Sequence, residues 1–432
     1  MELLKEKLNE NDLIVSFRMK DSDFTRNRKQ SFSQVLLFMF NLIRKSLGIE
    51  IDNFVRFMTD RLSHQKVSDF TSSAFVQNRK KINPEVFKFL SEIVVDNFYQ
   101  LESQSLNLFH GFRVLAVDGS LITLPNQTSL KQEFGVSKNQ TNTEIIQARA
   151  SILYDVLNKI VLDSSLTHID SSERELALMH KNQWKSKDLI IYDRGYTGFN
   201  LYREHIKQSV DFLIRVKITE SNIVKDFVKS KKKSLITEIA PCLSKSLKNK
   251  EYDITERIKI RLIRIELCSG EIEVLITSLI DSKKYPHKMF KELYFKRWGI
   301  ETLYDELKNK LKIEYFTGYS KQSILQDFNC AIFISNLQSV IINDLKEEIE
   351  IKNNNKKYEY KINTNLSYGL MKNRILELLC SETPIEIILK ELEKTLLKHI
   401  VPIRPNRSND RNTTKYRTRT KPKVLKNQKD AI

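Results

Sequence analysis

Several patterns that mark common classes of protein are missing from this 432-residue sequence. It has no HExxH and no GxxxxGK[ST] motif, which argues against a zinc protease and a P-loop ATPase. Its longest apolar run, residues 35–43, is too short to cross a bilayer and begins well inside the chain, so it predicts a buried helix. Cysteines are few and far apart, with no CxxC pair: Cys242, Cys268, Cys330 and Cys380. We therefore expect reduced thiols in a cytoplasmic protein, without a disulfide framework, a zinc knuckle, a membrane partner or a nucleotide cofactor.

Positive charge is abundant and unevenly placed. The formal net charge is +18 and the pI about 9.4, which favours a polyanionic partner such as nucleic acid. Residues 401–432 contain ten Lys or Arg against two Asp, and so contribute +8 of the +18. This segment is typical of a basic, disordered tail that can contact phosphates without sequence preference.

The first part of the chain, residues 1–105, has helical patterns and no strand alternation, which predicts an all-α N-terminal domain. Within it, Ser68 or Asp69 could cap a helix that ends in Arg79, Lys80 and Lys81, before an Asn-Pro break and another helix. This segment is either a helix-turn-helix-like DNA reader or an ordinary pair of short helices.

Residues 106–345 have a different character. Compact apolar strands at 113–118 and 188–193, strand-like segments between them and helical patterns at 172–183 and 199–208 predict a mixed α/β sheet with helices on its faces. Ser172 and Glu175 have the spacing of a capping box. The alternating segments within residues 218–285 predict an inserted antiparallel β region. After a helix at about 321–345, residues 346–400 predict a linker and C-terminal helices. One of them begins near Thr383, and its apolar face packs either inside the chain or against a partner.

Residues 294–311 predict one amphipathic helix with two stripes. At about 100° per residue, Tyr294, Arg297, Glu301 and Lys308 fall within an arc of roughly 60°, beside the apolar stripe that faces the core. The polar stripe is either a flanking row of charges whose stems cover apolar surface or a functional set.

The functional interpretation comes from two aspartates. Asp118 and Asp193 each end a buried-type strand, and functional groups of helix-covered sheets gather at strand carboxyl ends, although both aspartates also suit ordinary turns. With Glu301 added, three neighbouring carboxylates would need a cation. Oxygen ligands suit Mg²⁺ or Mn²⁺, and two such ions can promote in-line displacement at phosphorus. Arg297 and Lys308 would then hold phosphates, and Tyr294 would add a hydrogen bond or stack on a base.

The chain resembles the DDE transposases of bacterial insertion sequences, in the branch with the signature Y-x2-R-x3-E-x6-K, found here at Tyr294, Arg297, Glu301 and Lys308. The segments VDGSLITLP and YDRGYTGF around Asp118 and Asp193 are also similar to that branch, and the resemblance covers about residues 65–345. It implies an RNase H-like catalytic core with a β insertion before the last acidic helix. It also implies Mg²⁺-dependent nicking and strand transfer at terminal inverted repeats, with target DNA, by a synaptic homodimer associated with the bacterial nucleoid.

Some neighbours and some functions stay open at this point. Asp305 has a spacing that makes it a rival of Glu301, and Trp298, Arg194 and Ser120 are accessory candidates with packing or turn roles as alternatives. An RNase H-like DNA nuclease would have the same metal site without strand transfer. A transposase derivative that only binds DNA is the other alternative, against which the intact acidic residues argue.

Overall fold

The computed structural model describes residues 1–404, apart from 27, 42, 63–66, 102–105, 139–143, 242–252, 254, 268 and 355. Two compact units are present: residues 1–86, 306–315 and 337 onward form the first, and residues 87–305 and 316–336 form the second. Of the predicted reduced cysteines, Cys330 and Cys380 are buried thiols, whereas Cys242, Cys268 and the basic tail from 405 lie outside the described residues. In the described part of the chain, no helix is long and apolar enough to cross a membrane.

The first unit is helical. Its elements are α1 (Glu2–Asn9), α2 (Asn11–Phe17), α3 (Phe32–Phe40), α4 (Leu47–Arg61), α5 (Ser72–Arg79), α15 (Lys346–Asn353), α16 (Thr364–Met371), α17 (Arg374–Cys380), α18 (Ile385–Leu396) and the strand pair β10 (Tyr360–Ile362) and β11 (Ile400–Pro402). Helix α17 packs on α1 and α3, and Lys372 donates to both oxygens of the buried Glu50 carboxylate at 2.9 Å. The C-terminal helices therefore share a core with the N-terminal ones, although they are far apart in sequence.

Several sequence predictions about these helices need correction. Residues 35–40 of the apolar run lie in a buried helix, α3, which ends at Phe40, before the end of the run at 43. Helix α5, however, begins after Thr71, whose side chain accepts from the Ala74 amide, and not at Ser68 or Asp69. Its last residue, Arg79, is 2% exposed with its guanidinium over the Phe75 ring. Arg79 therefore contributes to the core and cannot extend toward DNA from this position.

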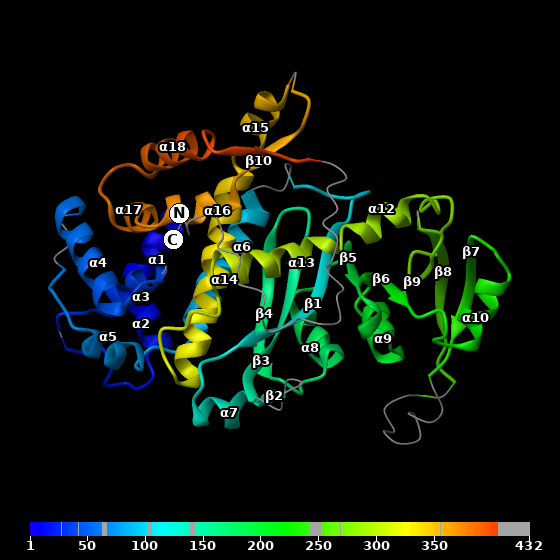
Figure 1. The fold of residues 1–432 in the computed structure, drawn as a ribbon, viewed down its shortest axis with the longest axis horizontal. Coiled ribbons are helices and arrows are strands. Elements are labelled where there is room, and N and C mark those ends of the chain that lie inside the picture. The colour runs from blue at the N-terminus through cyan, green and yellow to red at the C-terminus, as the bar shows by residue number, and fades with distance from the viewer. Residues whose placement is uncertain are drawn as a thin grey trace, which may run out of the picture. The chain divides into compact units, whose positions relative to one another are not determined.

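The second unit is built on one mixed sheet with the order β2-β3-β1-β5-β6-β9-β8-β7, and β4 pairs with β3 outside this path (Figure 1). The strands are β1 (Arg113–Thr123), β2 (Val136–Lys138), β3 (Glu144–Asp155), β4 (Ile160–His168), β5 (Asp188–Tyr192), β6 (Asp211–Val216), β7 (Ser234–Ile239), β8 (Ile258–Glu266) and β9 (Ile272–Thr277). Strand β5 is parallel to both β1 and β6, whereas β6 with β9, β9 with β8 and β8 with β7 pair antiparallel. The predicted mixed α/β sheet is confirmed, and the β7–β9 region extends its edge.

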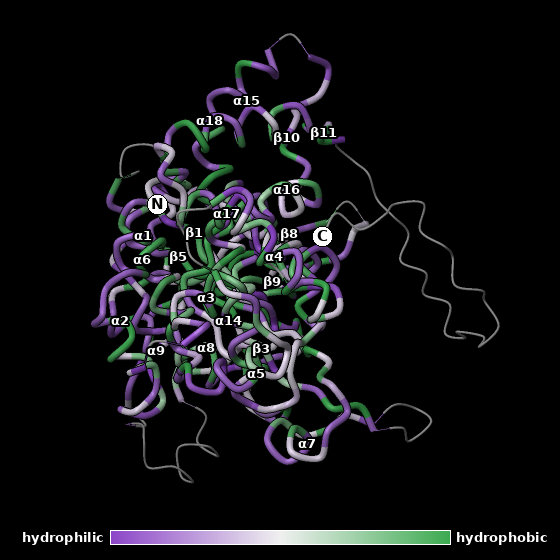
Figure 2. The backbone as a smooth tube through the Cα atoms, turned by 90° about the vertical axis from the view of Figure 1, so that its left-hand side faces the viewer, coloured by the Kyte–Doolittle hydropathy of each residue, from purple (hydrophilic) through white to green (hydrophobic). Residues whose placement is uncertain are grey.

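Helices cover this sheet. They are α6 (Glu85–Leu101), α7 (Thr128–Phe134), α8 (Glu173–Met179), α9 (Phe199–Lys207), α10 (Asn222–Lys229), α12 (Met289–Phe295), α13 (Trp298–Asp305) and α14 (Lys321–Asn343). Strands β1 and β5 are hydrophobic on both faces because helices pack on both sides, and the hydrophobic colouring in Figure 2 runs through the strands. The predicted capping box is wrong, because Ser172 precedes α8 without a side-chain cap, whereas α18 begins at Ile385, near the predicted position.

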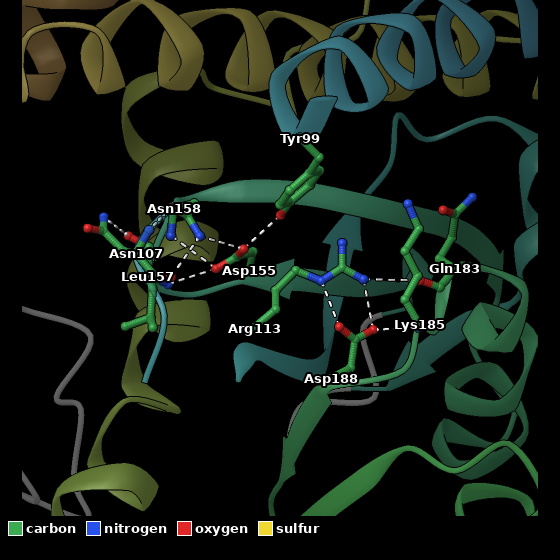
Figure 3. A network of polar contacts seen from close by, with 9 residues as sticks. All are labelled: Tyr99, Asn107, Arg113, Asp155, Leu157, Asn158, Gln183, Lys185 and Asp188. Atoms are coloured by element: carbon green, nitrogen blue, oxygen red, sulfur yellow. Dashed lines mark hydrogen bonds and ion pairs between the residues drawn. The ribbon is translucent and has the colours of Figure 1, made fainter. Parts of the chain in front are cut away.

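A buried polar network fixes the start of the two central strands (Figure 3). The Arg113 guanidinium donates to both carboxylate oxygens of Asp188 at 2.7 Å, and it lies 4.8 Å from the centre of the Tyr99 ring. The Tyr99 hydroxyl donates to Asp155 at 2.7 Å, and Asp155 also accepts from the Asn158 side chain at 2.8 Å. Because Arg113 begins β1 and Asp188 begins β5, this pair sets the register of the two strands that lead to the candidate site.

Candidate functional site

Asp118 and Asp193 lie at the same level of neighbouring strands. In the parallel pair, Ala116 of β1 is opposite Ile191 of β5, and each aspartate comes two residues later. Neighbouring strands are about 4.8 Å apart, so the register brings the two residues to one edge of the parallel part of the sheet. The prediction that Asp118 ends its strand is wrong, because β1 continues to Thr123 by pairing with β3. It is the parallel neighbour β5 that stops, which leaves Asp118 beside an open strand end.

The predicted continuous helix at 294–311 is interrupted. Helix α12 ends at Phe295, and α13 begins at Trp298, with the Lys296 and Arg297 amides bonded three residues back. From Glu306 to Lys310 the helix widens to a π-helical turn, which changes the rotation per residue. The rotation of 100° per residue that placed Lys308 on the same helix face as Glu301 therefore does not apply up to Lys308. Lys308 is half-buried and belongs to the first unit, so its place relative to the carboxylates is not described.

Arg297, at the junction of the two helices, lies between the acidic residues. Its Nη2 donates to Glu301 Oε1 at 2.7 Å, and its Nη1 is 3.9 Å from Asp118 Oδ2. The residue is 5% exposed, and no hydrogen-bond partner for its Nε is present among the described residues. Its guanidinium also lies over the rings of Tyr294 and Trp298. A buried cation thus already balances the charge of Asp118 and Glu301.

Asp193 has its own positive neighbour. Arg215, on β6, approaches Asp193 Oδ1 with Nη2 at 3.0 Å and binds Glu273 with Nη1 at 2.6 Å. The Tyr294 hydroxyl donates to the same Asp193 oxygen at 3.4 Å. Burial by itself would raise the pKa of Asp193, but the Arg194 amide and the charges of Arg215 and Arg297 outweigh it and lower the pKa. Asp193 is therefore held as a carboxylate.

Asp118 is in the opposite situation. Burial is the largest influence and raises its pKa to about 6, and the negative charges of Glu173 and Glu301 add to this increase. The Gly119 amide and the Arg297 charge act in the opposite direction, but they are outweighed. The ionised form of this carboxyl is costly unless more positive charge arrives. Three carboxylates with oxygen donors only are the chemistry that Mg²⁺ and Mn²⁺ prefer, so the donor set fits such an ion. As they stand, no group of three or more His, Cys, Asp or Glu in the described part of the chain is close enough to hold one.

Sequence reasoning missed a fourth acidic residue. Glu173, the first residue of α8, places its carboxylate against both turn glycines: a methyl group on Gly119 would lie 3.2 Å from Oε1, and one on Gly195 3.4 Å from Oε2. The same carboxylate pairs with Arg149 of β3 at 2.5 Å. No motif in the sequence singles out Glu173, because it reaches the site only through the packing of α8 against β1 and β3.

Two tyrosines also border the site. The Tyr304 hydroxyl donates to the Asp118 carbonyl at 3.0 Å, which ties α13 to β1. Tyr196 is 1% exposed, and its hydroxyl has no hydrogen-bond partner among the described residues. Burial raises the pKa of Tyr196 strongly, and the negative charges of Asp118 and Glu173 add to this increase. A buried hydroxyl beside two carboxylates can donate to a ligand there.

The remaining candidates lie further from this cluster. Arg194 is exposed, and Ser120 is half-buried in the pairing of β1 with β3. Trp298 is 41% exposed with one ring face under Arg297, so it combines packing with an accessible surface. Asp305 is exposed at the end of α13, whereas Glu301 directly contacts Arg297. The geometry therefore favours Glu301 over its rival.

The site is a carboxylate centre on a mixed α/β sheet. Its acidic residues come from two adjacent strands and a helix, and they surround a buried arginine. The comparison with protein families identifies the family to which this chain belongs. Residues 110–337 match the family described as Transposase DDE domain. This match spans more than half of the chain and includes all the residues of the centre, so the chain belongs to this family of polynucleotidyl transferases that cut and join DNA. Members of the family generally use divalent metal ions.

Comparisons outside the family add little. No curated protein matches the chain. Among solved structures, the chain is similar to a piggyBac transposase synaptic complex with hairpin DNA, with 11% identity, a TM-score of 0.42 and coverage of 95% of this chain and 87% of that one. It is also similar to a Mos1 transposase paired-end complex with the left transposon end, with 10% identity, a TM-score of 0.17 and coverage of 68% and 82%. Both scores are too low to support an argument, so the assignment rests on the family match.

Proposed function

We propose that the chain is the transposase of a bacterial insertion sequence, in the branch with the Y-R-E-K signature, and that it cuts and joins DNA at the terminal inverted repeats of its own element. One observation carries the proposal: within the matched family region, Arg297 joins Glu301 to Asp118, while Tyr294 of the same helical segment contacts Asp193. An RNase H-like core is part of the proposal. In this proposal, bound metal ions draw two acidic strand positions and one acidic helix position together at the end of the parallel strand pair, although the three residues are distant in sequence.

Each residue has a distinct part in this proposal. Asp118, Asp193 and Glu301 are the ligands, and two Mg²⁺ or Mn²⁺ ions bound there would activate the attacking oxygen and stabilise the leaving one. Tyr304 holds α13 against β1 and so positions Glu301 beside Asp118. Arg215 keeps Asp193 ionised and oriented. Arg297 balances the carboxylates in the free protein and, when they bind a cation instead, becomes available to the phosphate of the scissile strand.

The wider parts of the proposal follow from DNA as the substrate. Lys308 holds a phosphate of the same strand, and Trp298, with its accessible face, stacks on a base. Arg194 is exposed, and in this proposal it is an accessory residue that contacts the sugar–phosphate backbone of the DNA. We propose a homodimer that pairs two element ends at the bacterial nucleoid, with residues 1–105 and the tail at 401–432 adding DNA contacts to the catalytic region at 106–345. Residues 346–400 are the linker and the C-terminal helices, and these helices pack on the N-terminal ones.

The decisive experiment compares isosteric variants of the carboxylates with a matched control. Asp118→Asn, Asp193→Asn and Glu301→Gln remove a ligand charge, whereas Asp305→Asn removes an equal charge from the exposed end of the same helix as Glu301. Cleavage and joining of a DNA fragment carrying the element end are measured in Mg²⁺, and end binding is measured in EDTA. We expect the three ligand variants to bind and not to cleave, and Asp305→Asn to do both. Wild-type cleavage by Asp193→Asn would disprove the assignment.

The same assay separates the alternatives. An RNase H-like nuclease would release ends and never join them to a second duplex, because hydrolysis uses only water as the nucleophile. A derivative that only binds DNA would show neither product with the wild-type chain. Transposition requires that the free 3′ end becomes covalently linked to target DNA, which a labelled end detects as a larger product.

A further inference from the structure

A positively charged cleft lies on the second unit, outside the carboxylate cluster. It has a volume of about 430 Å³ and is formed where the turn after α10, the end of β8 and the start of α12 meet. Its cationic side chains are Lys231, Lys233, Arg264, Lys288 and Lys291. They come from three segments far apart in sequence, so the run of lysines at 231–233 does not by itself reveal the cleft.

Charge in this cleft is not balanced. Glu266 is the one acidic residue among its lining residues, against five cations, and none of the five forms a salt bridge within the described part of the chain. Two acids on the packed elements have other partners, because Glu292 pairs with Lys296 and Glu273 with Arg215. Mutual repulsion of unpaired cations is unfavourable for folding, so a concentration of this kind indicates an anionic ligand.

The backbone around the cleft is fixed by hydrogen bonds. The Arg264 amide donates to the Lys233 carbonyl at 3.0 Å, and the His287 ring is 2.7 Å from the Arg264 carbonyl. Lys291 Nζ lies 3.4 Å from the Glu266 carbonyl. The three segments are therefore held together before any ligand arrives, and the cations converge on a preformed site.

Helix α12 connects the cleft to the acidic residues. Lys288 and Lys291 are at its beginning, Tyr294 is near its end, and Arg297 and Glu301 follow through the tight junction to α13. Within α12, Tyr294, which contacts Asp193, lies three to six residues after Lys291 and Lys288, and at about 1.5 Å per residue this corresponds to roughly 5–9 Å. Successive phosphates of one DNA strand advance about 3.4 Å along the duplex axis, so this distance spans about one to three nucleotides.

We propose that this cleft binds the sugar–phosphate backbone of the duplex that the carboxylate centre cuts, about one to three nucleotides from the scissile phosphate. The inference rests on the proposed function for the nature of the ligand. Lysine and arginine donors spread over three segments suit successive phosphates of a strand, whereas one small anion needs only two or three of them. Contacts of this kind set the position of the duplex and do not read its sequence.

The test compares two triple variants of the full chain. Lys233→Gln, Lys288→Gln and Lys291→Gln together remove three charges from the cleft. The control removes three exposed lysines of the same unit that do not line the cleft, Lys225, Lys229 and Lys259, by the same change. Affinity for a duplex of about 30 base pairs is measured in EDTA from about 50 to 200 mM salt. Each lost phosphate contact should lower the slope of log affinity against log salt by about 0.9, so we expect a decrease of up to about 2.7 for the cleft variant and little change for the control.

Three further results decide the inference. Replacement of the same three lysines by arginine should retain the wild-type slope, which separates a charge effect from misfolding. An unchanged slope in the cleft variant, or an equal loss in the control, would overturn the proposal. Loss of inorganic phosphate binding in the cleft variant with an unchanged DNA slope would show a small-anion site and would also overturn it. Because binding is measured without divalent metal, failure of the cleavage assignment leaves this result unaffected.

Discussion

Neutralising Asp118 should stabilise the free protein, although it removes a proposed ligand. The pKa of this carboxyl rises from an ordinary 3.8 to about 6 on folding, chiefly because the group is buried. A carboxyl with a raised folded-state pKa stabilises the fold while it is protonated, and this contribution is lost as the pH rises from about 3.8 to 6. At 1.36 kcal/mol per pH unit, the ionised form costs up to about 3 kcal/mol above that range. Asp118→Asn is uncharged at every pH and avoids this cost.

The measurement is urea unfolding of wild type and Asp118→Asn in EDTA at a series of pH values. We expect the variant to be more stable by up to about 3 kcal/mol at pH 8 and by about half of that at pH 5, because the wild-type carboxyl is then mostly protonated. Asp305→Asn, which changes an exposed carboxyl, serves as the control and should follow the wild type at each pH.

Divalent metal supplies the second part of this prediction. Mn²⁺ should stabilise the wild type, since a ligand that binds only the folded state increases the free energy of unfolding, and should stabilise Asp118→Asn much less. An Asp118→Asn protein that is less stable than wild type at pH 8, or a difference that does not vary with pH, would refute the argument that burial of this charge is unfavourable.

Three other variants test individual contacts. Arg297→Gln leaves buried carboxylates without their cation, so it should destabilise the metal-free protein by about 3 kcal/mol in urea unfolding and gain more than wild type from added Mn²⁺; equal gains would contradict this role. Arg113→Met leaves the buried Asp188 carboxylate without its ion-pair partner, so the free energy of unfolding in the same measurement should fall by about 3–5 kcal/mol. Added Mn²⁺ should not restore this stability. Tyr196→Phe removes a buried hydroxyl that has no partner among the described residues, so the thermal midpoint without DNA should be unchanged or higher; a clear decrease would mean that the hydroxyl is already bonded.

The position of Arg297 changes how the spacing of the signature is understood. Its guanidinium is not exposed toward a ligand in the free protein but neutralises Glu301 and approaches Asp118. The same residue can therefore be required both for folding of the acidic site and for phosphate contact, and the two roles are separated by measuring stability and DNA binding in EDTA. The basic cleft beside α12 has no such second role, because its lysines form no ion pairs within the described residues.

Local patterns in the sequence determined most of the elements of this protein. Apolar runs predicted α3, β1 and β5, alternation predicted β8 and β9, and the order of strands and helices predicted a mixed sheet. Asp118, Asp193 and Glu301 could be named because strand ends and a helix face are local features. The continuation of β1 beyond Asp118 could not, because it depends on pairing with β3, and neither could the break of the 294–311 helix at Arg297.

Only the tertiary structure decided which charges meet. Glu173 and Arg215 belong to no catalytic motif in the sequence, and they reach the site because α8 packs against β1 and because β6 lies next to β5. The five cations of the cleft converge in the same way from three distant segments. Electrostatic energy depends on distance in space and on burial, and neither quantity is a property of sequence spacing. For this reason the sequence specified the acidic residues, whereas the fold specified the cations that balance them.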